Sequence, residues 1–139
     1  MAFYRCAACG GVSRVTGTGP DAPACPRCRS ALDVTGAPQP IDSVALVSVI
    51  LSSPAPVLVG FAAPGESSCA SLDDLASARA GEVVCLQVDT ASEPAAAEAY
   101  GVVELPTILL FCRGAEVGRV PARLPPRDIA RWISLAANA

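Results

Sequence analysis

The sequence predicts an α/β protein, with a mixed sheet covered by helices on both faces and a small metal-dependent module in front of it. Two observations lead to this prediction. Four of the seven cysteines form two Cys-x-x-Cys pairs near the N-terminus. The rest of the chain alternates apolar runs of strand length with segments of helical periodicity. Apolar residues make up 52% of the chain, which supports a packed core and excludes wholesale disorder.

The composition also excludes several classes of function. The chain has no histidine, so it can form neither a Ser/His or Cys/His catalytic pair nor a histidine metal site. A net charge of -3 argues against general nucleic-acid binding. We expect neither a secretory signal nor a membrane span, because the N-terminus lacks the signal pattern and prolines interrupt the uncharged run 44–63. The expected compartment is the cytoplasm, where reduced cysteines serve metal binding or redox chemistry.

The first module, residues 1–34, has the spacing of a two-knuckle zinc ribbon. Its predicted metal ligands are Cys6, Cys9, Cys25 and Cys28. Each Cys-x-x-Cys turn directs two thiolates at one ion, and the short segment between the turns cannot bury a core. Metal would therefore supply much of the folding energy. The spacing predicts one structural zinc ion per chain; iron of the rubredoxin type is less favoured, and two redox pairs without metal are the alternative.

The charge of this module does not favour a nucleic-acid role. Its four arginines are offset by two aspartates and by the two net negative charges of a zinc ion held by four thiolates. A structural cap or a protein-docking element is the plainer interpretation. Residues 35–41, with two prolines and a glycine, are predicted to be a linker.

Residues 42–139 supply the alternating elements of the second module. The pattern predicts helices over 42–52, from about 67 to 79, over 92–100 and from 126 onwards. Strands are expected over 57–61, 82–88, 107–112 and 116–120. The first helix is capped by Asp42 or Ser43. Its expected buried face consists of Val44, Val47, Ile50 and Leu51, and that of the last helix consists of Ile129, Trp132, Ile133 and Leu135.

Several motifs in residues 42–139 resemble thioredoxin. They are Val57-Leu-Val-Gly-Phe-Ala-Ala-Pro64, Val88-Asp89 and the run from Tyr100 to Phe111 with Gly114, in which Leu105-Pro106-Thr107 is the most specific. With its four-cysteine ribbon, the whole chain resembles thioredoxin 2, a bacterial subfamily. The resemblance implies the thioredoxin fold, a structural zinc ion in the ribbon and a cis peptide bond before Pro106, beside which an extended peptide pairs.

The chain departs from this family at the redox motif. Where the family has Trp-Cys-Gly-Pro-Cys, this sequence reads Gly65-Glu66-Ser67-Ser68-Cys69. Dithiol exchange needs an attacking thiolate at the start of a helix and a second thiol three residues later. Glu66 stands at the attacking position, and a carboxylate cannot exchange with a disulfide. The family's buried acidic residue in the first central strand is also replaced, by Gly60. Ordinary protein-disulfide reductase activity is therefore not expected.

Two functions remain for this second module. The first is a non-catalytic binding or adaptor module in a thiol-redox or protein-folding context, which holds a protein or an extended peptide in a groove. The expected groove residues are Gly65, Glu66, Ser67, Ser68, Leu105, Pro106 and Thr107. The alternative is a monothiol oxidoreductase that uses Cys69; as a plainer interpretation, Cys69 is a small buried residue. The sequence does not say whether the protein is an enzyme, nor does it identify the partner or the oligomeric state.

Overall fold

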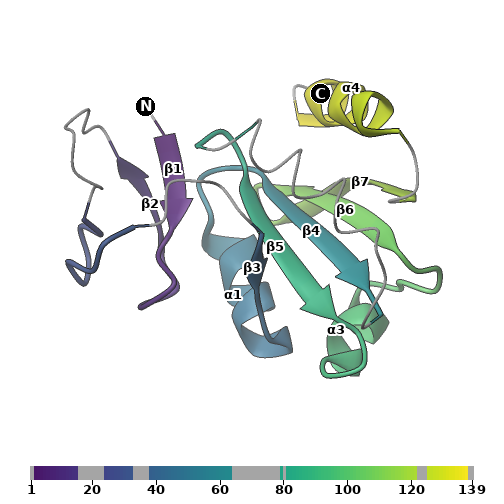
Figure 1. Cartoon of the computed structure of the whole chain (residues 1–139), viewed down its shortest axis with the longest axis horizontal. Coiled ribbons are helices and arrows are strands. Elements are labelled where there is room, and N and C mark those ends of the chain that lie inside the picture. The colour runs from purple at the N-terminus through teal and green to yellow at the C-terminus, as the bar shows by residue number, and fades with distance from the viewer. Residues whose placement is uncertain are drawn as a thin grey trace.

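The structure is a computed structural model that describes residues 2–15, 24–32, 38–63, 79, 81–121 and 125–137. These residues form two sheets (Figure 1). The ribbon contains β1 (Ala2–Arg5) and β2 (Val12–Val15), which pair antiparallel. The second sheet has five strands in the order β3-β5-β4-β6-β7.

The five-stranded sheet is mixed. Its strands are β3 (Gln39–Pro40), β4 (Val57–Ala62), β5 (Val84–Asp89), β6 (Thr107–Cys112) and β7 (Ala115–Pro121). β3 and β4 run parallel to β5, whereas β6 runs antiparallel to both β4 and β7. The central strands are apolar almost without interruption, because both faces of the sheet are covered.

Three described helices cover this sheet: α1 (Ser43–Ser52), α3 (Pro94–Ala99) and α4 (Pro126–Ala137). Figure 1 shows α4 on the opposite side of the sheet from α1 and α3. Successive residues of a strand point to opposite faces, so the sheet builds two separate cores. The predicted fold class, a mixed sheet with helices on both faces, is confirmed. None of the described helices has the length and apolar character needed to cross a membrane.

Alternate residues of the central strands supply the two cores. The core on the side of α1 and α3 includes Leu46, Val49, Ile50, Val57, Val59, Phe61, Val84, Leu86, Val88, Ala96, Leu109 and Phe111. The core on the side of α4 includes Leu58, Val83, Cys85, Ile108, Leu110, Ile129 and Ile133. Cys85 is thus a packing residue of β5, as its position in an apolar strand predicts.

The start of α1 confirms one prediction, and its buried face corrects another. Asp42 is the N-cap, and its carboxylate accepts a hydrogen bond of 2.7 Å from the Ala45 amide. The helix buries Leu46, Val49 and Ile50, whereas Val44 and Leu51 are 83% and 70% exposed.

Val44, Val47 and Leu51 all belong to the predicted buried face, and Val47 is also 42% exposed. The reason for the error is that α1 carries no charged residue, so its sequence offers two apolar stripes. A similar correction applies to α4, where Ile129 and Ile133 are buried as expected but Leu135 is 70% exposed.

Two further findings concern the connections. Within the predicted linker 35–41, Gln39–Pro40 forms the edge strand β3 beside β5. Glu93, at the start of α3, does not cap its own helix; its carboxylate accepts hydrogen bonds of 2.7 and 3.1 Å from the amide and hydroxyl of Ser43. This contact ties α3 to the start of α1. Except for Arg79, the helix predicted from about 67 to 79 lies outside the described residues.

Candidate functional site

The two Cys-x-x-Cys knuckles bring four sulfur atoms together. The Sγ atoms of Cys6, Cys9, Cys25 and Cys28 all lie within 4.8 Å of one another. The Sγ atoms of Cys6 and Cys28 are 3.5 Å apart, and those of Cys9 and Cys25 are 3.7 Å apart. Four sulfurs around a tetrahedral zinc ion, each at about 2.3 Å, would lie about 3.8 Å from one another. The donor set and its spacing therefore fit a metal ion, as the sequence predicts.

The same backbone turn builds both knuckles. In the first, the Cys6 amide donates to Gly11 and the Gly10 amide donates to Cys6, at 2.9 and 2.7 Å. In the second, the Cys25 amide donates to Ser30 and the Arg29 amide donates to Cys25, both at 2.8 Å.

The fifth residue of each turn lies in the left-handed region, with φ of 79° at Gly10 and 65° at Arg29. Glycine adopts this conformation freely, whereas arginine is strained in it.

The knuckles are anchored by one buried cysteine each. Cys6 and Cys25 are both 1% exposed and pack with Leu32 and Tyr4, while Cys9 and Cys28 lie at the surface. The second knuckle also supplies a backbone donor, since the Arg27 amide lies 3.4 Å from the Cys25 sulfur. Amide donors of this kind stabilise thiolates and orient them toward an ion.

The four thiols differ in acidity. Hydrogen bonds from the side chain and then the backbone of Ser30 lower the pKa of Cys28 to about 6. Backbone amides of its own knuckle, with that of Cys28 foremost, also lower the pKa of Cys25. For Cys9, the Gly11 amide acts to lower the pKa, but desolvation and the other sulfurs raise it to about 11. Part of the cluster thus ionises readily, which suits metal binding because the ligands must be deprotonated.

Two arginines, Arg5 and Arg27, flank the first knuckle, an arrangement that the spacing of the cysteines does not predict. A Cβ placed on Gly11 would lie 2.9 Å from Nη1 of Arg27, and one on Gly10 would lie 3.6 Å from Nη2 of Arg5. Burial lowers the pKa of Arg5, against the opposing effect of negative charge at Asp42 and the cysteines. The sequence could have indicated this arrangement, because Arg5 directly precedes the first knuckle and Arg27 lies inside the second.

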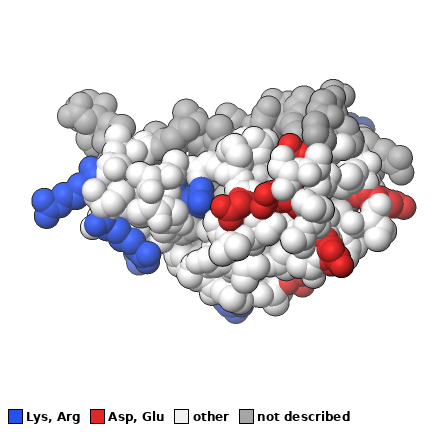
Figure 2. Space-filling view, turned by 90° about the horizontal axis from the view of Figure 1, so that it is seen from below, with Lys and Arg blue, Asp and Glu red and all other residues white. Residues whose placement is uncertain are grey.

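Charge is distributed unevenly over the molecule. In Figure 2, basic side chains gather at the end that holds the ribbon, and acidic side chains gather over the five-stranded body. The ribbon exposes Arg14, Arg27 and Arg29. A divalent ion held by four thiolates carries two negative charges, which these neighbouring cations offset.

The second candidate site lies where β6 begins. The Leu105–Pro106 peptide bond is cis, as the resemblance implies. Thr107 is buried, and its hydroxyl donates a hydrogen bond of 2.6 Å to the Glu104 carbonyl. A hollow of about 250 Å³ opens here, lined by Glu104, Leu105, Pro106 and Pro121. The predicted groove residues Gly65, Glu66, Ser67 and Ser68, and Cys69 with them, lie outside the described residues.

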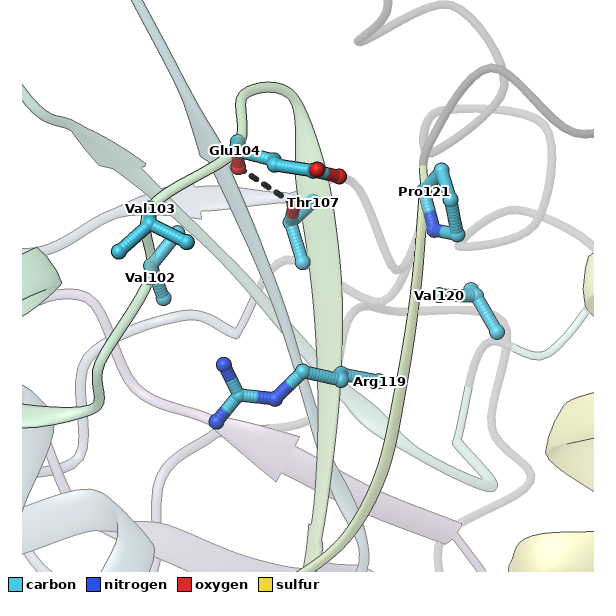
Figure 3. A pocket seen from close by; sticks show the side chains of 7 residues that line it. All are labelled: Val102, Val103, Glu104, Thr107, Arg119, Val120 and Pro121. Atoms are coloured by element: carbon cyan, nitrogen blue, oxygen red, sulfur yellow. Dashed lines mark hydrogen bonds between the residues drawn. The ribbon is translucent and has the colours of Figure 1, made fainter.

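A second hollow, of about 180 Å³, adjoins the first on the side of β7 (Figure 3). Val102, Val103, Val120 and Pro121 give it an apolar lining, and the Arg119 side chain extends along its lower edge in this view.

Arg119 holds the chain that leads to the cis bond. Its guanidinium pairs with Glu116 at 2.7 Å and donates to the carbonyls of Tyr100 and Gly101 at 2.9 and 3.1 Å. The segment before the cis bond is thereby attached to β7.

Besides Cys85 in the core, one described cysteine lies outside the two sites. Cys112 ends β6 and is half-buried, and burial raises the pKa of its thiol against the opposing charge of Arg113. A raised pKa leaves less thiolate at neutral pH, so this thiol has no sign of activation.

Comparisons with known proteins agree with the fold. Residues 41–135 match the sequence profile of the thioredoxin family. The chloroplastic thioredoxin M5 of Oryza sativa subsp. japonica is 36% identical over 90 residues, which cover 62% of this chain and 52% of that protein. Thioredoxin 1 of a Nostoc species is 30% identical over 88 residues, which cover 60% of this chain and 82% of the relative. The chain thus spans about half the length of the rice relative.

A solved structure has the same fold. A mutant thioredoxin from Halobacterium salinarum NRC-1 superimposes with a TM-score of 0.64 at 23% identity, covering 76% of this chain and 95% of that one. The mixed sheet and the cis-proline loop define a protein of the thioredoxin fold. Since the family profile spans more than half of the chain, the protein belongs to the thioredoxin family.

Proposed function

We propose that this protein is a thioredoxin-family module that binds a protein or extended peptide without dithiol exchange, in a thiol-redox or protein-folding context. The observation that carries the proposal is the combination of a retained cis-proline loop with an altered redox motif. The Leu105–Pro106 bond is cis, while Glu66 stands where the attacking cysteine of the resembling family stands. A chain with these two features would still offer a surface for an extended peptide while lacking the nucleophile for disulfide exchange.

The surface around the cis bond supports a peptide partner. Leu105 and Val103 are 39% and 91% exposed, and hollows adjoin the loop on two sides. An extended chain can form main-chain hydrogen bonds at such a loop and place apolar side chains in the hollows. Thr107 and Arg119 hold the loop in place through hydrogen bonds to Glu104 and to the segment before it.

The four-cysteine cluster supports a structural zinc ion as part of the same proposal. Soft thiolate donors without a carboxylate or histidine favour zinc, with iron less favoured. Bound at Cys6, Cys9, Cys25 and Cys28, one zinc ion per chain would supply folding energy to a ribbon with a very small apolar cluster. Elemental analysis of the purified protein is expected to give about one zinc per chain, as a four-thiolate site requires.

Insulin reduction in the presence of a thioredoxin reductase tests the loss of exchange chemistry. The wild-type protein is expected to show no turnover, because a carboxylate cannot attack a disulfide. The variant Glu66→Cys, which restores two thiols at the family spacing, is the matched positive control. Turnover by the wild-type protein at ordinary thioredoxin rates would refute the proposal.

Binding of reduced, alkylated insulin B chain tests the groove. Leu105→Asp places a charge beside the cis bond and is expected to weaken binding by about tenfold or more, because apolar contact area is lost. The matched control is Val117→Asp on β7, where the wild-type side chain is similarly exposed at 42%. Equal binding by the two variants would place the peptide elsewhere.

A second candidate function follows from Cys69, which keeps the family's resolving position. A single thiolate there would attack the disulfide of a partner or of a small molecule, forming a mixed disulfide and releasing the other sulfur as a thiolate. Native alkylation with iodoacetamide, followed by mass mapping, measures whether this thiol reacts, with Cys69→Ser as the control. If Cys69 stays unmodified while the thiols of the denatured protein react, the monothiol function is excluded.

A further inference from the structure

β1 is shared between the ribbon and the thioredoxin-like body. Its side chains alternate between two environments, as the pleat of a strand requires. Phe3 packs against the core beneath α1, and the Arg5 side chain reaches Gln39 of β3. Tyr4 and Cys6, which directly follows the strand, belong to the cluster around the knuckles. One strand thus presents one face to the metal site and the other face to the body.

Arg5 forms the polar part of this contact. Its Nη1 donates to the Gln39 side-chain carbonyl at 2.6 Å, and the Gln39 amide nitrogen donates to the Arg5 backbone carbonyl at 3.0 Å. Two reciprocal hydrogen bonds between the same residues fix both the position and the direction of β1 relative to β3. A third bond, from the Phe3 amide to the Gly81 carbonyl at 2.9 Å, attaches β1 near the start of β5.

The surroundings of Arg5 link this contact to the knuckles. Its side chain is only partly exposed, and its Nε is a buried atom without a hydrogen-bond partner among the described residues. Its Nη2 lies beside Gly10, at the back of the first knuckle. A desolvated cation in this position is stabilised by nearby negative charge, and a four-thiolate centre loaded with a divalent ion carries two such charges.

We propose that Arg5 is a positioning residue that couples metal binding in the ribbon to the stability of the thioredoxin-like body through Gln39. A metal ion fixes Cys6, which fixes β1, and the Arg5–Gln39 and Phe3 contacts then stabilise the edge of the five-stranded sheet. A ligand that binds the docked state preferentially must stabilise that state, and the coupling is reciprocal. This inference rests on the metal site of the proposed function.

Trp132 makes the coupling measurable from the far side of the molecule. It is the chain's single tryptophan and lies on α4, where its ring packs against Gly118 of β7. Figure 1 shows α4 at the end of the body away from the ribbon. Its fluorescence during thermal unfolding therefore reports on the body, while a chromophoric chelator reports separately on bound zinc.

The experiment compares the Trp132 transition of the full chain in saturating zinc and in excess chelator. For the wild type, removing zinc is expected to lower the midpoint by about 5 °C or more. Arg5→Met removes the side-chain hydrogen bond and Gln39→Leu removes both hydrogen bonds. Both variants are expected to bind one zinc per chain but to lose at least about half of this shift, with the larger loss in Gln39→Leu. Arg14→Met is the matched control, because the Arg14 side chain is exposed on β2 and has no polar contact with the other described residues.

Each outcome decides the inference. A full wild-type shift in both test variants, or an equal loss in Arg14→Met, would overturn it. If Arg5→Met does not fold, Gln39→Leu decides the matter, because it leaves the ribbon sequence intact. A wild-type chain that binds no zinc would refute the metal site and this inference together. One zinc per chain with no effect on the Trp132 transition would overturn this inference alone.

Discussion

The ribbon and the thioredoxin-like body are stabilised in different ways. In the described part of the ribbon, the buried cluster around the knuckles consists of Cys6, Cys25 and Leu32, so two of its three members are predicted metal ligands. Val12 of β2 is also buried, but it packs with the core of the body. The body instead has two extensive apolar cores on opposite faces of its sheet. A region with so little buried apolar area depends on another source of folding energy, whereas the body depends on its packing.

The largest expected effect is loss of the ribbon's metal. Cys25→Ser removes a buried ligand and is expected to abolish stable zinc binding, since structural zinc contributes on the order of 10 kcal/mol in small domains. Zinc content after dialysis and limited proteolysis of the ribbon are the measurements. Cys112→Ser, at the end of β6, is the control and should keep about one zinc per chain. Tight zinc binding by Cys25→Ser would contradict the four-cysteine site.

The body, in contrast, is expected to lose stability when a cavity is made in its apolar core. Leu58 is fully buried in β4, so Leu58→Ala should lower the free energy of unfolding by about 2–5 kcal/mol. Urea unfolding followed by Trp132 fluorescence measures this change, and the zinc content of the folded variant should not change. Leu135→Ala on the exposed side of α4 is the control, with an expected effect within about 0.5 kcal/mol. Comparable losses at the two positions would refute the assignment of these faces.

Gly118 in the body and Gly11 in the ribbon each lie so close to a neighbouring side chain that an added Cβ would be crowded. A Cβ on Gly118 would lie 3.0 Å from two atoms of the packed Trp132 ring, and a Cβ on Gly11 would lie 2.9 Å from the end of the Arg27 side chain. Gly118→Ala should therefore cost about 1–3 kcal/mol.

Gly11→Ala should cost less, because a surface guanidinium can move. Chemical unfolding of the first variant and zinc competition on the second test this ranking. The reverse order would show that Arg27 is held as firmly as the tryptophan.

The smallest expected effect is a gain in the stability of the zinc-bound ribbon. Arg29→Gly relieves a left-handed residue in the second knuckle, where φ is 65°, and should stabilise the zinc-bound ribbon by roughly 0.5–1 kcal/mol. Competition with a chelator measures this as a modest increase in zinc affinity. Arg14→Gly in β2 is the control and should weaken the ribbon, because glycine is unfavourable in a strand. Weaker zinc binding by Arg29→Gly would mean that its side chain matters more than its backbone.

Much of the fold and of the cysteine cluster could be predicted from local patterns in the sequence. The spacing of the cysteines identified the cluster that the structure brings within 4.8 Å. The strands 57–61 and 107–112 were recognised because buried strands are short apolar runs, and Asp42 because caps have specific residue types. The Leu105-Pro106-Thr107 motif indicated the cis bond by resemblance. Gly65 to Cys69 remain a prediction from the sequence.

The alternation of elements and the grouping of the four cysteines can be predicted from the sequence, because both depend on spacing along a short stretch of chain. The packing of the whole chain decided which apolar stripe of α1 is buried, since Val44 and Leu46 are equally apolar and differ only in what packs against them. It also decided that Arg5 meets Gln39, 34 positions away. Contacts between distant residues arise from the packing of the whole chain, and local periodicity carries no record of them.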